Sequence, residues 1–305
     1  MVHGLSRKSF LAGCGATLAW AGRGVLASDA TVLRRPIPKS GEMLPVMGLG
    51  TAVVFGSAPP EAQRAVVKAL VDNGGSLIDT APTSSPAYAG AEPGTGQAVT
   101  DLGLRKRCFF ATKVGARSKE EGEALIAASF KALQTDVIDL LQVHNLMDTA
   151  TQLATLRDLK AKGRIRYVGV THSQADGQEA LAEWLAKEPL DFVQLNYALD
   201  VRGPEQRLLP LAAEKGVAVL VNLPLGRGRL LRNLGDKPLP GWAKDVGATS
   251  WAALLLKYVI AHPAVTVAIP GTKNPQHMAE NLHAARGPLL TQAQRQELIG
   301  IVEKA

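Results

Sequence analysis

The chain has 305 residues, of which 46% are hydrophobic and 20% charged, a composition that excludes a mainly disordered protein and provides material for a large core. The formal net charge is +7, from 34 basic and 27 acidic residues, with no run of Lys or Arg and only 5% aromatic residues. This modest excess argues against a nucleic-acid-binding protein and would suit a protein that holds a phosphate.

The first 30 residues have the pattern of an export signal peptide that is removed from the mature protein. The basic pair in "SRKSFL" precedes an apolar stretch, residues 10 to 21, that is too short to span a bilayer. Small residues give a cleavage site after Ala27 or Ala30, so no stable membrane anchor is expected to remain. The basic pair is similar to a bacterial twin-arginine signal, which implies export of the folded protein to the periplasm or the medium. A lysine at the second basic position leaves the route open, and a lipoprotein box ending at Cys14 or an uncleaved anchor are alternatives.

From residue 31 onward, short apolar runs alternate with helical patterns. Eight runs begin near Val46, Leu77, Cys108, Val137, Tyr167, Asp191, Val217 and Val265. The helical patterns start at Pro59 with Pro60, at Ser118 with Glu121 as a capping box, at Pro204, and at Asn274 with Pro275, and two of them end at Gly74 and Gly216. The wide last spacing predicts an insertion at residues 229 to 247, before a helix at 250 to 261. A final helix is expected at about 291 to 304.

Eight such units with nearly continuous apolar strands predict a parallel sheet that is covered on both faces. The architecture that fits is an α/β fold of the (β/α)8 TIM barrel type, formed as a single domain by residues 31 to 305 with a C-terminal helix. A doubly wound open sheet is the alternative. Its dinucleotide-binding fingerprint G-x-G-x-x-G should follow the first strand, and "GLGTAVVFG" does not supply it.

Polar residues end six of the expected strands, and in TIM barrels the active site lies at these strand ends. They are Asp79, Lys113, His144, Thr171 with His172, Gln194 with Asn196, and Asn222. A buried carboxylate needs a partner, and Lys113 on the neighbouring strand is the natural one for Asp79. Taken singly, His144 is explained as a core histidine and the Asp79 and Lys113 pair as a structural ion pair. Together, at three consecutive strand ends, they predict a functional site.

The motifs around these strand ends resemble the aldo-keto reductase superfamily. They run in order from about residue 44 to residue 290 and include "GLGT", "IDTAP", "ATKVG", "DLLQVH", "VQLNY" and "IPGTKNPQHMAENL". The resemblance implies a TIM barrel enzyme that reduces aldehyde or ketone carbonyls to alcohols with a nicotinamide cofactor. It places the catalytic aspartate, lysine and histidine of the family on Asp79, Lys113 and His144.

The catalytic tyrosine of the family has two possible positions in this chain. It usually follows the aspartate by five residues, where this chain has Ser84. The loop is longer here than in the relatives that the chain resembles, and removal of "TSSP", residues 83 to 86, aligns "AYAGAEPGTG" with the family pattern and selects Tyr88. We assign Tyr88, because an alkyl hydroxyl is a far weaker acid than a phenol with a pKa of about 10. The alternative is a chain that has lost its acid.

The resemblance implies a role for each of the four residues. Tyr88 is expected to donate a proton to the carbonyl oxygen as a hydride reaches the carbon. The Lys113 ammonium is expected to lower the pKa of Tyr88, and Asp79 to keep Lys113 charged and aimed. His144 is expected to hydrogen-bond the substrate oxygen and orient it.

The resemblance also predicts the residues that bind the cofactor. The nicotinamide carboxamide is expected near Thr171, His172 and Gln194, and the aromatic residue that stacks on the ring in the family is replaced by Asn222. The pyrophosphate is expected at the loop "PLGRGRL", where an arginine would supply positive charge. The alternative is that the arginines of this loop form a solvated basic face. The adenosine is expected at the helix start "PGTKNPQHMAEN". The full predicted set is Gly50, Thr51, Thr171, His172, Gln194, Asn222, Leu225, Gly226, Arg227, Gly228, Gly271, Thr272, Lys273, His277, Glu280 and Asn281.

NADPH is the expected cofactor, with NADH as the alternative. The lysine and arginine that some family members use for the 2′-phosphate are Gly271 and His277 here. Lys273 and its neighbour Thr272 compensate for them in this interpretation.

Two other functions compete with that of a carbonyl reductase. A noncatalytic nicotinamide-nucleotide-binding barrel, acting as a redox sensor or a subunit, would explain the displaced Tyr88 and the replacement at Asn222. A Schiff-base lyase would use Lys113. The six histidines are scattered, so no metal site is predicted. The sequence identifies neither the substrate beyond a small carbonyl compound nor the oligomeric state.

Overall fold

The structure is a computed structural model, and it describes residues 31 to 304. The expected export signal lies outside the described residues, so it stays a prediction. Within residues 31 to 304, no helix is long and apolar enough to cross a lipid bilayer.

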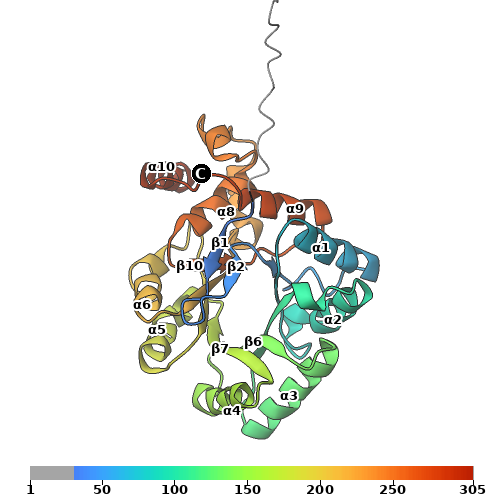
Figure 1. The fold of residues 1–305 in the computed structure, drawn as a ribbon. Helices are drawn as coiled ribbons and strands as arrows, with labels where there is room; N and C mark the ends of the chain where they lie inside the picture. The colour runs from blue at the N-terminus through green and yellow to red at the C-terminus, as the bar shows by residue number, and fades with distance from the viewer. Residues whose placement is uncertain (1–30, 305) are drawn as a thin grey trace, which may run out of the picture. The chain divides into compact units, whose positions relative to one another are not determined.

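Eight parallel strands form the predicted barrel and follow one another around it in chain order (Figure 1). Parallel bridges from Met47 to Ala268 and from Gly50 to Gly271 join the last strand to the first and close the barrel. Closure requires glycine at position 50, because a Cβ there would lie 2.6 Å from the carbonyl oxygen of Ile269. The strands are β3 (Leu49–Gly50), β4 (Leu77–Asp79), β5 (Phe109–Val114), β6 (Ile138–His144), β7 (Ile165–His172), β8 (Phe192–Asn196), β9 (Ala218–Asn222) and β10 (Val265–Ala268).

Helices follow the strands and surround the barrel (Figure 1). Those that alternate with the strands are α1 (Pro60–Asp72), α2 (Ala91–Asp101), α3 (Lys119–Ala132), α4 (Thr149–Ala161), α5 (Gln178–Lys187), α6 (Leu208–Glu214), α8 (Trp251–Ala261) and α9 (Pro275–Ala284). The predicted insertion contains the short helix α7 (Arg229–Leu234), and the predicted C-terminal helix is α10 (Gln292–Glu303).

The predicted caps at the starts of α3 and α9 are present, with one correction. Asn274 caps α9 by accepting the N–H of Gln276 at 2.8 Å. Ser118 caps α3 by accepting the N–H of Glu121 at 3.2 Å. The Glu121 carboxylate, however, accepts the N–H of Arg117 instead of that of Ser118, so the predicted capping box is incomplete.

The helix predicted to start at Pro204 is also corrected. Residues Gly203–Glu205 form a 3-10 turn, and α6 begins only at Leu208. The backbone of Arg207, with φ −139° and ψ −56°, leaves the helical range and separates the two elements.

An N-terminal hairpin, β1 (Arg34–Pro36) and β2 (Met43–Pro45), lies across the end of the barrel where the strands begin (Figure 1). Ile37 and Leu44 are buried there against the apolar interior of the barrel. This hairpin closes the base, and the interior cluster that it covers includes Leu77, Phe109, Ala111, Leu140, Tyr167, Phe192, Ala218 and Leu220.

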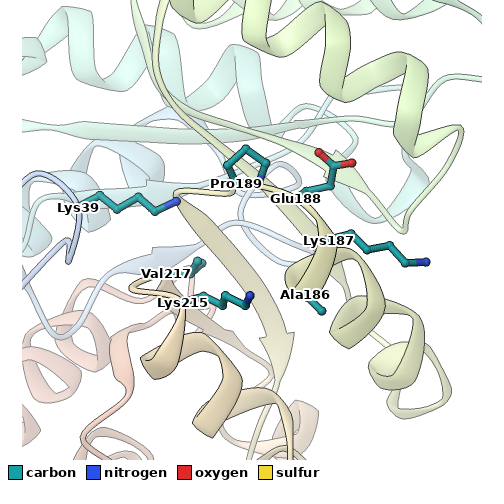
Figure 2. Close-up of a pocket in the computed structure, with 7 residues that line it drawn as sticks. All are labelled: Lys39, Ala186, Lys187, Glu188, Pro189, Lys215 and Val217. Carbon is teal, nitrogen blue, oxygen red and sulfur yellow. The ribbon is translucent and has the colours of Figure 1, made fainter.

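A cavity of about 320 Å³ lies on the outside of the same end of the barrel (Figure 2). Lys39 of the hairpin loop, Pro189 before β8 and Val217 before β9 line it. A second cavity, of about 280 Å³, lies between the hairpin and residues 105 to 109. Both are therefore remote from the carboxyl ends of the strands.

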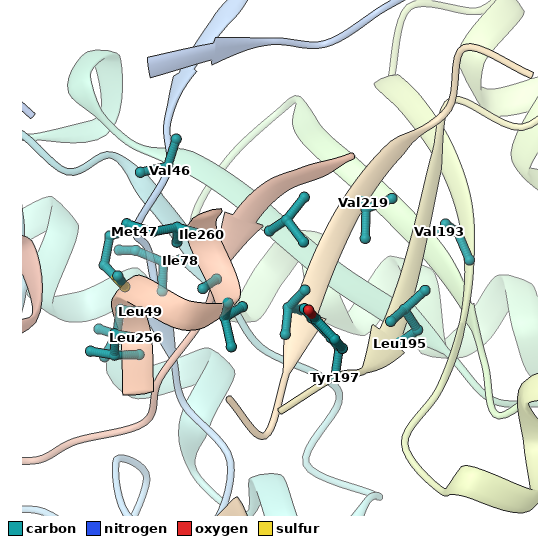
Figure 3. Packing of buried hydrophobic residues seen from close by; sticks show 14 of the residues in the cluster. Val46, Met47, Leu49, Ile78, Val193, Leu195, Tyr197, Val219, Leu256 and Ile260 are labelled. Atoms are coloured by element: carbon teal, nitrogen blue, oxygen red, sulfur yellow. The ribbon is translucent and has the colours of Figure 1, made fainter. Parts of the chain in front are cut away.

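The larger apolar core lies between the strands and the helices (Figure 3). Val193, Leu195 and Tyr197 project from β8 and the residue after it into this core, where Leu256 and Ile260 of α8 also lie. Successive side chains of a strand point to opposite faces. The residues between them, among them Gln194 and Asn196, consequently face the barrel interior.

Candidate active site

The alternation of side chains produces an apolar layer inside the barrel with a polar layer above it. On β4 and β5, Leu77, Phe109 and Ala111 belong to the apolar interior, and the next inward positions are Asp79 and Lys113. The same period of two leads from interior residues of β6, β8 and β9 to Gln142, Gln194 and Asn222. The polar side chains therefore gather at the carboxyl ends, where TIM barrel active sites lie.

Asp79 and Lys113 form the buried centre of the polar layer, with side chains only 1% and 2% exposed. Lys113 Nζ lies 2.8 Å from both carboxylate oxygens of Asp79 and 2.7 Å from the carbonyl oxygen of Thr80. Burial alone would lower the pKa of Lys113, but the charges of Asp79 and Tyr88 and hydrogen bonds to both raise it. The lysine stays an ammonium ion, and a protonated amine disfavours the Schiff-base lyase.

Thr51 fixes the backbone of Asp79. Its N–H and its hydroxyl both donate to the Asp79 carbonyl oxygen, at 3.0 Å and 2.9 Å. Thr51 is fully buried, so this residue of the predicted cofactor set holds the end of β4 in the structure.

Tyr88 ends a 3-10 turn, Pro86–Tyr88, in the loop after β4, and it is half-buried. Lys113 Nζ lies 4.9 Å from the centre of its ring. The His144 imidazole meets the same ring edge-on, with 6.2 Å between ring centres. Ser84, the alternative position, is exposed. The structure thus brings Tyr88 together with Lys113 and His144.

The pKa of Tyr88 is set by opposing effects. Burial raises this pKa above its ordinary value. The charge of Lys113 lowers it, as expected, and so does that of Arg227, but burial is the larger effect. The predicted effect of Lys113 is present but is outweighed by burial, so the phenol stays protonated at neutral pH, which is the form that a proton donor needs.

The loop after β3 contacts the loop after β4, which carries Tyr88. The N–H of Val53 donates to the carbonyl oxygen of Ala87 at 2.5 Å, and Val53 has a φ of 69°, which is rare for a β-branched residue. Gly56 approaches the same loop so closely that a Cβ would lie 2.0 Å from the carbonyl oxygen of Ala89. Such strain persists where the surrounding contacts over-determine the backbone, and it is concentrated at functional sites.

His144 ends β6 at the rim and is half-buried. Burial lowers its pKa to about 3, and the positive charges of Lys113 and His172 act in the same direction. The imidazole is therefore neutral at physiological pH and can donate one N–H to a substrate oxygen. Within residues 31 to 304, no group of three or more His, Cys, Asp or Glu side chains is arranged to hold a metal ion.

Gln142 belongs to this polar layer and was not among the predicted residues. It is fully buried, its Nε2 donates to Gln194 Oε1 at 3.0 Å, and it lowers the pKa of Asp79. The signal that could have found it is its place on β6, two residues before His144 and therefore on the same face of the strand.

Thr171 and His172 end β7 at the expected rim. Thr171 is 2% exposed and lies opposite Gln194 in the register of β7 and β8. His172 is half-buried and accepts the N–H of Gln174 at its Nδ1, at 3.3 Å. A Cβ on Gly177 would lie 1.9 Å from the same nitrogen, so His172 packs against the loop that follows β7.

Asn222 and Asn196 are partners in the register at the ends of β9 and β8. Both are half-buried, and among the described residues their Oδ1 atoms have no hydrogen-bond partner. Buried polar atoms are normally satisfied, so these oxygens are acceptors available to donor groups of a ligand.

The loop predicted to meet the pyrophosphate has an unusual backbone after Leu225. Gly226, Arg227 and Gly228 have φ values of 56°, 55° and 77°, in the left-handed region that glycine adopts readily. Arg229 is paired with Asp200, at 3.0 Å between Nε and Oδ2. Arg227 is exposed and, as far as the structure describes the chain, forms no ion pair, so its charge remains available.

The region predicted to bind adenosine lies between β10 and α9. Lys273, His277 and Glu280 are exposed there, as is Gly271. Two members of the predicted set are 7% exposed, Thr272 and Asn281. The hydroxyl of Thr272 accepts the N–H of Asn274 at 3.0 Å, so this residue also supports the start of α9.

Comparisons with known proteins agree on one family. A model of the aldo/keto reductase family matches residues 46–303. An aldo-keto reductase of Mycobacterium sp. (strain KMS) is 31% identical over 254 residues, which cover 79% of this chain and 83% of that protein. An NADH-specific methylglyoxal reductase of Escherichia coli (strain K12) is 32% identical over 194 residues, or 55% of this chain and 58% of the relative. A solved structure of an aldo/keto reductase from Klebsiella pneumoniae, in complex with NADP and acetate, has a TM-score of 0.73 at 29% identity and covers 86% of this chain and 93% of its own.

Proposed function

The chain belongs to the aldo/keto reductase family, and from this membership we propose which residues perform its chemistry and which cofactor it prefers. It is an NAD(P)H-dependent oxidoreductase that reduces aldehyde or ketone carbonyls to alcohols. The observation that supports the assignment of residues is the buried pair of Asp79 and Lys113 with the ring of Tyr88 4.9 Å from the ammonium nitrogen.

The residues at the rim fit a nicotinamide nucleotide. Buried amide oxygens without partners among the described residues, those of Gln142, Asn196 and Asn222, offer acceptors to a polar ligand. Arg227 offers a cation beside backbone that glycines leave open. We infer that Thr171 and Gln194 hold the carboxamide and that residues 225 to 228 hold the pyrophosphate.

A nicotinamide nucleotide held by these residues would supply a hydride to the carbonyl carbon, and the chain supplies the proton and the charge. Tyr88 donates its phenolic proton to the oxygen, which completes the alcohol and leaves a phenolate. The Lys113 ammonium stabilises that phenolate, and Asp79 keeps the ammonium in place at 2.8 Å. Neutral His144 donates an N–H to the substrate oxygen and fixes its direction.

We propose NADPH as the preferred cofactor. Lys273 and His277 are exposed at the start of α9, where the helix dipole also favours a phosphate. The Klebsiella pneumoniae structure was solved with NADP, whereas the Escherichia coli relative is named as NADH-specific. Both cofactors therefore belong in the test.

Two experiments test the proposal together. The purified protein is titrated with NADPH and with NADH, and binding is measured by nicotinamide fluorescence. Turnover is then measured on a panel of aldehydes, ketones and quinones. We expect NADPH to bind at least about tenfold more tightly than NADH, because one charge-assisted hydrogen bond supplies about that factor. We also expect at least one carbonyl class to be reduced. Tighter binding of NADH would contradict the cofactor preference, and binding without turnover on the whole panel would contradict catalysis.

A further inference from the structure

Gln142 is a buried amide that contacts both halves of the site. It stands on β6, opposite Lys113 of β5 and Gly169 of β7 in the register, and its side chain is fully buried. Its Nε2 donates to Gln194 Oε1 at 3.0 Å, and the same amide lowers the pKa of the Asp79 carboxyl. Its Oε1 has no partner among the described residues.

Packing alone gives no reason for an amide at this position. The inward residue below it on the same strand is Leu140, which belongs to the apolar interior. An amide with an unpaired buried oxygen is less favourable for stability than a leucine of similar volume. The two side chains on which Gln142 acts, Asp79 and Gln194, are those assigned to catalysis and to the cofactor.

These contacts fix the orientation of Gln194. Its Oε1 accepts from Gln142, and the Asp79 carboxylate, whose pKa Gln194 also lowers, can only accept. Gln194 is therefore left with N–H as the group that it can offer to a ligand. Without Gln142 its amide would lose the hydrogen bond that holds its oxygen.

We propose that Gln142 is a positioning residue that joins the Asp79 and Lys113 pair to Gln194, so that cofactor binding and the electrostatics of proton transfer depend on one amide. The inference rests on the proposed function, since it takes Gln194 as a cofactor contact. It adds a residue and a coupling that the assignment of the four catalytic side chains does not contain.

The fold provides a matched control in Gln152 of α4. Gln152 is also fully buried, its Nε2 also donates one hydrogen bond of 3.0 Å, and its Oε1 also has no partner among the described residues. That bond goes to the backbone oxygen of Ser118 at the start of α3, among the outer helices. Gln152→Leu therefore removes the same groups from the fold without touching Asp79 or Gln194.

The test compares Gln142→Leu and Gln142→Met with Gln152→Leu, using circular dichroism, NADPH affinity and the dependence of kcat on pH. We expect the Gln142 variants to bind NADPH about tenfold more weakly and to lose about tenfold in kcat, with KM for the carbonyl substrate changed less than about threefold. The acid limb of kcat should move to higher pH. Gln142 lowers the pKa of Asp79, so its removal raises this pKa and Asp79 releases Lys113 at a higher pH.

Gln152→Leu should change neither NADPH affinity nor the acid limb. Unchanged affinity and an unchanged acid limb in a folded Gln142 variant would overturn the inference, and so would equal changes in Gln152→Leu. If Gln142→Leu does not fold, the same measurements are made on Gln142→Met. A wild-type protein that neither binds a nicotinamide nucleotide nor reduces a carbonyl would instead contradict the proposed function.

Discussion

His144 stays neutral in the folded protein because burial lowers its pKa to about 3, with Lys113 and His172 adding to the effect. In the unfolded chain a histidine has a pKa of about 6.5, so the unfolded state binds more protons than the folded state between these two values. Stability from this group is therefore complete above pH 6.5 and is lost as the pH falls toward 3. Since the imidazole does not change charge between pH 5 and 9, it cannot produce a pH dependence of turnover in that range.

His144→Gln tests this account, because glutamine carries no charge at any pH. We expect the free energy of unfolding of the wild-type protein to fall between pH 7 and pH 4 by roughly 2 to 3 kcal/mol more than that of His144→Gln. Urea denaturation of both proteins at the two pH values measures the difference. Equal losses would mean that His144 titrates alike in the folded and unfolded chains.

Among single residues, Asp79, Lys113 and His144 could be predicted at the ends of their strands, because each motif is local and each strand end is clear in the sequence. The choice of Tyr88 over Ser84 depended on the length of a loop and on the acidity of a phenol. The sign of the Tyr88 pKa shift could not be predicted, since it depends on how deeply the loop is buried. Gln142 was missed because its importance lies in a contact across the barrel with Gln194.

Among the elements, the two loops that follow β3 and β4 decide where the phenol lies. The N–H of Val53 in the first loop donates to the carbonyl oxygen of Ala87 in the second, and Gly56 lies too close to Ala89 and Ala91 to leave space for a Cβ. The position of Tyr88 thus depends on a close approach between two loops, and a displacement of about 1 Å can reduce a rate about a hundredfold.

Gly56→Ala is predicted to push the Tyr88 loop away. Its Cβ would lie 2.0 Å from the carbonyl oxygen of Ala89 and 2.8 Å from the backbone nitrogen of Ala91, so the backbone must move. We expect kcat to fall by about tenfold or more while NADPH affinity changes less than about threefold. Gly300→Ala in α10 is the matched control, because nothing lies within 4 Å of a Cβ there. Wild-type kcat in a folded Gly56→Ala protein would show that the contact does not position Tyr88.

The long elements were predictable because a period of two or of 3.6 and clear caps extend over many residues. The N-terminal hairpin was not predicted, since its strands β1 and β2 have three residues each and carry no measurable alternation. The helix expected at Pro204 was misjudged for a related reason. Proline marks a helix start but does not determine the backbone of Arg207 three residues later.

For the whole molecule, eight alternating units were sufficient to predict the TIM barrel, and family motifs carried the catalytic set onto it. Closure of the barrel depends on contacts between residues more than 200 positions apart, such as Gly50 with Ile269 and Gly271, which no local pattern contains. Export from the cell stays a prediction from residues 1 to 30.

The central claim is that closure of the barrel brings a protonated phenol to a buried ammonium ion for proton transfer to a carbonyl. The rate of carbonyl reduction by Tyr88→Phe measures it most directly. The matched control is Tyr167→Phe at the base of the barrel, where the hydroxyl contacts Ser40 and Glu42 at 2.9 Å and 2.6 Å. We predict that Tyr88→Phe lowers kcat by about 10²- to 10⁴-fold with NADPH affinity almost unchanged, and that Tyr167→Phe retains the wild-type rate. Reduction by Tyr88→Phe at the wild-type rate would contradict the claim.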